Sequence, residues 1–394
     1  MTSRLRIACV SLHTSPTDMP GQGDAGGMNV VELNQALALG RSGHSVDLIT
    51  RRASDDQPAL SEVAGGVRLR LIDAGPPRPM AKSAQEAVLD EFRAGLARLE
   101  PYDVVVSQHW MSGVAALPIA RGWSVPHLQS YHSIAAPVGA DLSAGEPPES
   151  AGREAGERLL ARESDAIITI SRAEARTVIE RLGADPARVH VVPPGVDHEV
   201  FVPQLQRAHP PYVAYAARLQ PLKAPDLAVR AIAAVPPEIR PELHIAGDTS
   251  ADFADYGAEL QALVDELGVR DKVRFVGSFD RPGLAEFLGR AVLTIVPSYS
   301  ETFGLVALES AACGTPVIAS AVGGLVEAVA DDVSGTLMHT RDPAAWGGEI
   351  ARLSGDPAAW RALVSGAQQH AATFGWDASA DGLLGVLARV VGRG

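Results

Sequence analysis

Short apolar runs rich in β-branched residues recur along the whole chain, and stretches with helical spacing separate them. In the first half the runs lie at 4–12, 44–52, 67–75, 103–110, 125–133, 166–171 and 188–195. In the second half they lie at 212–219, 242–248, 273–279, 291–298, 315–320 and 335–338. Strands buried on both faces have near-continuous apolar sequences, and their alternation with helices indicates parallel βαβ units. The pattern therefore predicts an α/β protein whose parallel sheets are covered on both faces.

The chain is long enough for two such units. At 394 residues it exceeds the size at which one hydrophobic core usually stops growing. The segment VVPPGVD at 191–197 interrupts the pattern near the middle, and its prolines and glycine form a stiff turn suited to a hinge. We therefore expect units at 1–193 and 194–372, followed by a C-terminal helix within 373–394. Two doubly wound sheets would present the carboxyl ends of their strands, where such sheets bind ligands, to a shared cleft.

Charge and cysteine content exclude several classes of function. The 47 acidic and 34 basic residues give a net charge of −13, which disfavours nucleic acid or an anionic membrane as a partner. The cysteines are Cys9 and Cys313, so neither a disulfide framework nor a cysteine zinc site is expected, and no metal site is predicted. The first residues are too polar for a signal peptide and no stretch approaches a membrane span, so the predicted location is the cytoplasm.

A glycine-rich loop follows the first predicted strand. Gly21, Gly23 and Gly26 have the G-x-G-x-x-G spacing of a dinucleotide fingerprint, but the loop before them is too long for that motif. Gly26 and Gly27 instead leave the backbone accessible at the start of the next predicted helix, where amides and the helix dipole favour an anionic or polar ligand. A flexible loop with a glycine cap is the equally weighted alternative. Asn29 could bind a hydroxyl at the edge of the cleft.

Two cations follow the first strand of the second half. In ARLQPLKAPD, Arg218 lies at the end of the strand and Lys223 just before the next helix. An arginine fork and a lysine point charge at the ligand edge of a sheet suit a diphosphate. The alternative is a solvated pair bonded to surface acids.

Two glutamates bracket a turn in PSYSETFGLVALESAACGTP, residues 297–316. The apolar run before it predicts a strand, and Gly304 opens a helix that Gly314 ends. The amides of 303–305 would then lie at a helix N-terminus as a second anion site. Glu301 precedes these amides and Glu309 lies inside the helix, so the carboxylates could accept hydroxyls from different parts of one ligand. Taken separately, each glutamate is more typical of a structural salt bridge.

Together these motifs resemble the retaining glycosyltransferases of the GT-B architecture, whose signature is two glutamates separated by seven residues. The likeness covers the chain and is closest to the N-acetylglucosaminyltransferases that make glucosaminyl-inositol phosphate in mycothiol biosynthesis. The stretches that carry it are SLHTSPTDMPGQGDAGGMNV, ARLQPLKAPD, PSYSETFGLVALESAACGTPVIASAVGG and PPGVDHEVF. It implies two doubly wound Rossmann-like domains facing a central cleft. Residues 1–193 would bind the acceptor and 194–372 the nucleotide-sugar, and a helix in 373–394 could cross back to the N-terminal domain.

The resemblance also implies roles for individual residues. Arg218 and Lys223 would hold the donor diphosphate, and Gly27 would approach it from the other domain. Glu309 would bind the ribose, and His132 would contact the 6-hydroxyl of the transferred hexose. Glu301 would bind that hexose, together with the backbone of Phe303 and Gly304, and Leu305 would also belong to the donor site. His132, Arg218, Lys223 and Glu301 form the implied catalytic set.

The acceptor side departs from the pattern that the resemblance implies. Lys82 is present in AGPPRPMAKSAQ, but the tyrosine expected in that loop is missing. A second expected tyrosine is His109, an expected threonine is Ser133, and the lysines expected in IAAPVGAD are absent. Arg153 matches the remaining phosphate-binding arginine. With Asn29, these residues form the predicted acceptor site.

The leading hypothesis is a retaining hexosyltransferase that moves N-acetylglucosamine from UDP-N-acetylglucosamine to inositol 1-phosphate or a related cyclitol. A natural-product paralogue acting on an aminocyclitol, a thiol or another small acceptor, with a different nucleotide-sugar, is the alternative. A two-domain sugar-binding protein without catalysis is a second class. An NADP oxidoreductase, suggested by the glycine spacing and by Arg51 and Arg52, is a third. No cofactor is required, and a Mg²⁺ ion accompanying the donor and a homodimer both stay open.

Overall fold

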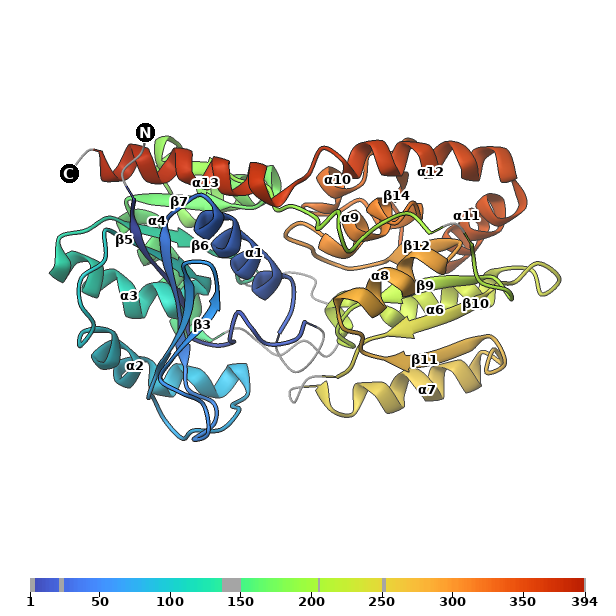
Figure 1. Ribbon diagram of the computed structural model, residues 1–394. Coiled ribbons are helices and arrows are strands. Elements are labelled where there is room, and N and C mark those ends of the chain that lie inside the picture. The colour runs from blue at the N-terminus through green and yellow to red at the C-terminus, as the bar shows by residue number, and fades with distance from the viewer. Residues whose placement is uncertain (1–3, 21–24, 137–149, 205, 250–252, 393–394) are drawn as a thin grey trace.

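The protein consists of two α/β halves that lie side by side (Figure 1). The computed structural model describes residues 4–20, 25–136, 150–204, 206–249 and 253–392. Gly21 and Gly23 of the glycine-rich loop lie outside these residues. Each half has one sheet, and the described strands and helices alternate along the chain as the sequence predicts.

The N-terminal half contains an eight-stranded sheet in the order β3-β4-β2-β1-β5-β6-β7-β8. Its strands are β1 Arg6–Ser11, β2 Ser45–Arg51, β3 Leu60–Ala64, β4 Val67–Ile72, β5 Val104–Gln108, β6 His127–Ser130, β7 Ala166–Thr169 and β8 Val189–Val191. All neighbouring pairs are parallel except β3 with β4, which form an antiparallel hairpin at the edge. The sequence runs predicted each of these strands except β3.

Helices cover both faces of this sheet, because its strands carry apolar side chains on both sides. They are α1 Gly27–Arg41, α2 Leu89–Leu96, α3 His109–Trp123, α4 Ala151–Glu163 and α5 Arg172–Leu182, with short 3-10 turns η1 Lys82–Val88 and η2 Pro186–Arg188.

The C-terminal half contains a six-stranded parallel sheet in the order β11-β10-β9-β12-β13-β14. Its strands are β9 Tyr212–Ala216, β10 Glu242–Ala246, β11 Val273–Gly277, β12 Leu293–Val296, β13 Val317–Ser320 and β14 Gly335–Met338. Its helices are α6 Pro225–Ala234, α7 Tyr256–Glu266, α8 Arg281–Arg290, α9 Leu305–Ala312, α10 Leu325–Ala328, α11 Pro343–Gly355 and α12 Pro357–Ala371, with the turn η3 Pro221–Lys223. This strand order is that of a Rossmann fold, so the prediction of doubly wound domains is confirmed.

The last helix, α13 Trp376–Val391, returns to the N-terminal half and packs beside α1 (Figure 1). Its side chains Ala380, Leu383, Val386, Leu387 and Val390 belong to the same buried cluster as those of β1, β2 and α1. Gln35 also donates to Ser379 Oγ over 2.9 Å. The predicted crossover helix is therefore confirmed. The proposed limits of the three units at 193 and 372 stay a prediction.

The chain passes between the halves at two adjacent points. Val196 forms an isolated bridge with Gly375, and a Cβ atom on Gly195 would lie 2.4 Å from Trp376 N. Nearby, Val30 and Val31 of α1 join the buried cluster around α9. The halves thus share apolar packing as well as two crossings. Among the described helices, none is both long and apolar enough to cross a membrane.

Candidate active site

The connection from β12 to α9 forms the centre of the candidate site. Gly304 takes a left-handed conformation with φ 99° and starts α9. The amides of Phe303, Gly304 and Leu305 have no hydrogen-bond acceptor among the described residues. Three unsatisfied amides at a helix N-terminus make a ready site for an anion.

The loop is held by a close backbone contact with the turn that precedes α10. Gly324 N donates to Glu301 O over 2.8 Å. A Cβ atom on Gly323 would lie 2.0 Å from Glu301 O, and one on Gly324 would lie 2.1 Å from Thr302 O. Only glycine allows the two loops to approach this closely, so the glycine pair fixes the position of the amides.

Both glutamates of the motif are ion-paired. Lys223 Nζ lies 2.6 Å from Glu301 Oε1, which also accepts from Ser298 Oγ over 3.0 Å. Arg281 Nη1 lies 2.5 Å from Glu309 Oε1. The side chains of Glu301 and Glu309 are only 14% and 5% exposed, so each pair is largely withdrawn from water. The salt bridges that the sequence suggested as the alternative role of each glutamate are therefore present. They lie among the groups predicted to bind the donor.

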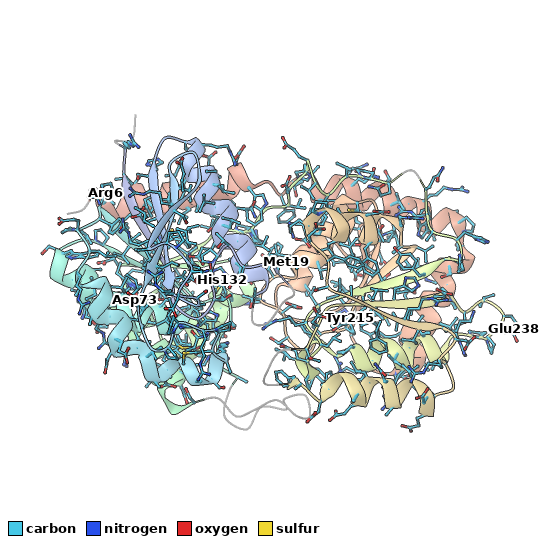
Figure 2. All side chains as sticks on the ribbon, turned by 60° about the horizontal axis from the view of Figure 1, so that its bottom comes forward. Arg6, Met19, Asp73, His132, Tyr215 and Glu238 are labelled. Atoms are coloured by element: carbon cyan, nitrogen blue, oxygen red, sulfur yellow. The ribbon has the colours of Figure 1, made fainter. Side chains whose placement is uncertain are left out.

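The backbone before Lys223 positions its side chain. Lys223 ends the turn η3, and Ala224 follows with φ 50°. Tyr215, buried in β9, donates from its hydroxyl to Lys223 O over 3.2 Å. In the view of Figure 2, Tyr215 and His132 lie in opposite halves with Met19 between them. Lys223 thus lies just before the next helix, α6, as the sequence predicts.

The start of α1 reaches the donor side of the site. A Cβ atom on Gly26 would lie 3.8 Å from Arg218 Nε, and one on Gly27 would lie 3.3 Å from Leu305 Cδ1. Asn29 is 1% exposed. Its Oδ1 accepts from Gly26 N over 2.9 Å, and its amide donates to Thr14 Oγ1 and Ser15 O over 2.9 and 2.6 Å. Asn29 thus braces the loop, and its predicted contact with an acceptor hydroxyl stays a prediction.

His132 is a half-buried imidazole with a defined tautomer. Its Nε2 lies 2.5 Å from Gln108 Oε1 and 3.2 Å from Ser130 Oγ. Because an amide oxygen only accepts, Nε2 carries the proton and Nδ1 is the acceptor. Nδ1 has no partner among the described residues. Burial lowers the pKa of His132 to about 4, so the ring is neutral at pH 7.

One hydroxyl links His132 to the connection between β12 and α9. Thr302 Oγ1 donates to His132 O over 2.6 Å, although the two residues belong to different halves. His132 has φ 56°, a strained conformation for a histidine, and this conformation turns its carbonyl toward Thr302. Sequence reasoning missed Thr302 because nothing in SETF indicates which distant segment it meets.

The predicted acceptor residues gather beside His132. Arg153 Nη2 donates to Ser133 Oγ over 3.1 Å, and its Nε pairs with Glu157 Oε1 at 2.8 Å. Lys82 lies at the start of η1. The charges of Lys82 and Arg153 both act on His109, which is 1% exposed. Ser133, Lys82, His109 and Arg153 thus share one region.

His13 joins this group, although no motif in the sequence singled it out. Its ring centroid lies 4.3 Å from that of His109. Burial and then the charges of Lys82, Arg218 and Arg153 lower its pKa well below the usual value. Because Arg218 belongs to the C-terminal half, the donor and acceptor groups meet at this point.

The arginine pair after β2 has a structural role. Arg51 Nη1 donates to Arg52 O and Pro76 O over 2.8 and 2.9 Å, and its Nη2 donates to Arg78 O over 2.7 Å. Arg52 Nε pairs with Asp73 Oδ1 at 2.6 Å. Both guanidinium groups therefore hold neighbouring loops, and the NADP hypothesis loses the cations on which it depended.

Comparison with known proteins agrees with this arrangement. Residues 197–370 match the family model described as glycosyl transferases group 1, and residues 26–195 match that of the glycosyl transferase 4-like domain. The chain is 41% identical to a D-inositol 3-phosphate glycosyltransferase of Stackebrandtia nassauensis, covering 98% of this chain and 92% of the relative. It is 42% identical to the protein of the same name from Nocardiopsis dassonvillei, covering 97% and 94%. Among solved structures, sucrose-phosphate synthase from Thermosynechococcus elongatus superposes with a TM-score of 0.92 at 28% identity, covering 99% of this chain and all of that one.

Proposed function

The chain belongs to the group 1 glycosyl transferase family, and we propose that it moves a hexose from a nucleotide-sugar to inositol phosphate with retention of anomeric configuration. UDP-N-acetylglucosamine is the proposed donor. The observation that carries the proposal is the convergence of Lys223, Glu301 and the three unsatisfied amides next to His132 and the cationic acceptor group. The names of the two curated relatives support inositol phosphate as the acceptor.

Donor binding would exchange internal ion pairs for ligand contacts. Lys223 and Arg218 would bind the diphosphate, and the amides of 303–305 would donate to the donor's oxygens. Glu301, released from Lys223, would accept hydrogen bonds from hexose hydroxyls. Glu309 would accept from the ribose hydroxyls in the same way, beside Arg281. Each carboxylate stays hydrogen-bonded throughout, so the exchange leaves no buried charge without a partner.

The proposed chemistry needs no carboxylate nucleophile. The bond between the anomeric carbon and the diphosphate oxygen breaks, and the acceptor hydroxyl forms the new bond on the same face. The acceptor's proton passes to an oxygen of the leaving diphosphate. Lys223 and Arg218 stabilise the negative charge that develops there. The ion pairs of Glu301 and Glu309 support this scheme, because glycosidases use carboxyl groups that are available to act as acid and nucleophile.

His132 would orient the hexose without transferring a proton. Its neutral ring offers Nδ1 as an acceptor to the hexose 6-hydroxyl, since Nε2 is occupied by Gln108. Its carbonyl is held by Thr302, which follows the proposed hexose-binding glutamate. Contact between the halves would also exclude water, which would otherwise compete with the acceptor for the anomeric carbon.

A paralogue with a non-phosphorylated acceptor is the second candidate, and the observation that favours it is His109. The resemblance implies a tyrosine there, whereas this chain has an imidazole whose ring centroid lies 4.3 Å from that of His13. An aminocyclitol or another small polar acceptor could use such a site. A cytoplasmic location stays part of the proposal.

A panel assay tests the proposed reaction. The purified chain is incubated with each of several nucleotide-sugars and with inositol phosphate, free inositol or aminocyclitols, and nucleotide release and product mass are measured. We expect UDP-N-acetylglucosamine and inositol phosphate to give by far the fastest release, because Lys82 and Arg153 favour a phosphate. Product with an inverted anomeric centre would refute retention. Equal use of inositol and inositol phosphate would refute the phosphate site, and binding without any product would favour a sugar-binding protein.

A further inference from the structure

Two histidines lie against each other at the acceptor side of the site, His109 buried and His13 half-buried. His13 follows β1, and His109 is the first residue of α3, in a left-handed conformation with φ 68°. Their ring centroids are 4.3 Å apart and the ring planes are inclined at 44°. Gln85 Nε2 donates to His13 O over 2.9 Å, so the segment that carries Lys82 is tied to the same place.

The pair has hydrogen-bonding atoms that the protein does not use. Within the described residues, both ring nitrogens of His109 and Nδ1 of His13 are buried without a partner. A neutral imidazole has one donor and one acceptor nitrogen, and leaving these unsatisfied in the interior is unfavourable. These buried and unsatisfied ring nitrogens indicate that a ligand supplies the missing partners.

Positive charge surrounds the pair from several elements. Lys82 of η1 and Arg153 of α4 act on both rings, and Arg218 after β9 acts on His13. The imidazole of His132 after β6 is a further titratable neighbour of both rings, but it is neutral at pH 7. Burial and then these charges lower the pKa of both imidazoles well below the usual value. The nearby carboxylate of Glu157 is bonded to Arg153 and to Ala135 N. Both rings are therefore neutral at pH 7 in the free protein.

We propose that His13 and His109 are part of the acceptor site and that the pair takes up a proton from solvent when a phosphorylated cyclitol binds. This inference rests on the proposed function. A phosphate dianion among Lys82, Arg153 and Arg218 offsets much of the positive charge that, together with burial, keeps the rings neutral. An imidazolium then donates from both nitrogens to phosphate oxygens. A free cyclitol brings no charge and draws no proton, so the pair selects for a phosphorylated acceptor.

The sign of the pH dependence follows from proton linkage. The complex binds more protons than the free protein, so affinity for the acceptor is higher at lower pH and falls as pH rises through the imidazole pKa of the complex. Above about pH 7 the phosphate is almost fully dianionic, since its second pKa is about 6. The loss of acceptor affinity between about pH 7 and 8.5 therefore reports the histidines.

Calorimetry measures the proton directly. The full chain, saturated with UDP, is titrated with inositol phosphate at pH 7.0 in buffers of different ionisation enthalpy, and the slope of the observed enthalpy gives the protons taken up. We expect an uptake of about half a proton or more per acceptor bound. A slope of zero or a net release in the wild-type protein overturns the proposal, whatever the variants do.

Variants locate the proton. His13→Gln and His109→Gln should each reduce the uptake at least twofold, and the control His339→Gln, at an exposed histidine, should keep it. UDP affinity and thermal unfolding show whether each variant is folded. If His109→Gln does not fold, His13→Gln alone tests whether the pair takes up the proton. Uptake unchanged in a folded variant of either histidine overturns the assignment. Transfer to inositol phosphate without proton uptake refutes this inference alone, whereas proton uptake without transfer refutes the proposed function alone.

Discussion

At the scale of single residues, charged side chains proposed to bind the donor form internal ion pairs. Lys223 pairs with Glu301 and Arg281 pairs with Glu309, in surroundings where both carboxylates are mostly buried. Arg281 also lies 4.4 Å from the centre of the Phe201 ring, which fixes its guanidinium in place. The pairs hold the site in shape before the ligand arrives, so little ordering is left for binding to supply.

Replacing Lys223 by alanine tests the diphosphate contact. The substitution removes a charge-assisted bond to the donor and leaves Glu301 with Ser298 as its remaining side-chain partner. We expect UDP affinity by calorimetry to fall about 10- to 100-fold, the range for a hydrogen bond to a charged group. Lys272 lies outside the candidate site and supplies the control. The variant Lys272→Ala should bind UDP with normal affinity. Unchanged affinity in Lys223→Ala would contradict the assignment.

The sequence could identify site residues that belong to a local motif, and little more. Lys223 and Glu301 were selected because each follows a recognisable strand, and the structure brings the two together at 2.6 Å. Thr302, His13 and Arg281 were missed, because their roles depend on partners from distant segments. The bond from Thr302 to His132 joins residues 170 positions apart, and no spacing rule encodes such a contact.

At the scale of elements, the β12–α9 unit depends on the glycines before α10. Gly324 has φ −76°, a backbone conformation that any residue could adopt. Glycine is required here because there is no space for a side chain. A Cβ atom there would lie 2.5 Å from Phe303 Cα as well as close to Thr302 O. Both contacts are with backbone, which cannot move aside as a flexible side chain would.

Gly324→Ala should therefore disturb the amides of the anion site. We expect a loss of about 1–3 kcal/mol in the free energy of unfolding, as for other overpacked substitutions, and weaker UDP binding. Gly348→Ala is the matched control, since this exposed position in α11 has open space around it. That variant should be more stable by about 0.5–1 kcal/mol. Denaturant unfolding measures both, and equal stability of the two variants would contradict the packing argument.

Strands were predictable where burial left a continuous apolar run. β3 was not predicted because it lies at the edge of the sheet, where its residues are alternately exposed and half-buried. The available signal was the pair Gly65–Gly66 before β4, a turn that favours a hairpin, and Gly66 does adopt φ 88°. A continuous apolar run indicates a buried strand, so a hairpin at the edge of a sheet is better predicted from the residues of its turn.

At the scale of the whole molecule, polar contacts join the halves beside the candidate site. Glu327 of α10 accepts through Oε1 from Arg172 N over 2.7 Å and from Ala173 N over 3.4 Å. These amides start α5, so the carboxylate also meets the positive end of that helix dipole. With the Thr302 bond to His132, this contact holds the two halves in the arrangement that forms the site.

Glu327→Ala should loosen that arrangement and leave each half intact. We expect a larger radius of gyration by small-angle scattering and a higher ratio of donor hydrolysis to transfer, because water reaches the donor more often. UDP affinity should change less than threefold, since Glu327 lies outside the groups that bind the donor. Glu259→Ala, at an exposed position of α7, is the control. A variant with wild-type scattering and hydrolysis would show that Glu327 does not hold the halves together.

The return of α13 has a consequence for synthesis. Leu383 and Leu387 of this helix are buried with Ile7 and Leu48, which the ribosome makes more than 300 residues earlier. During translation the nascent N-terminal half therefore keeps one apolar face uncovered until α13 emerges. At typical elongation speeds of roughly 5–20 residues per second, that delay lasts tens of seconds. The N-terminal half thus reaches its native form only after the C-terminal half has been made, which reverses the usual order of domain maturation.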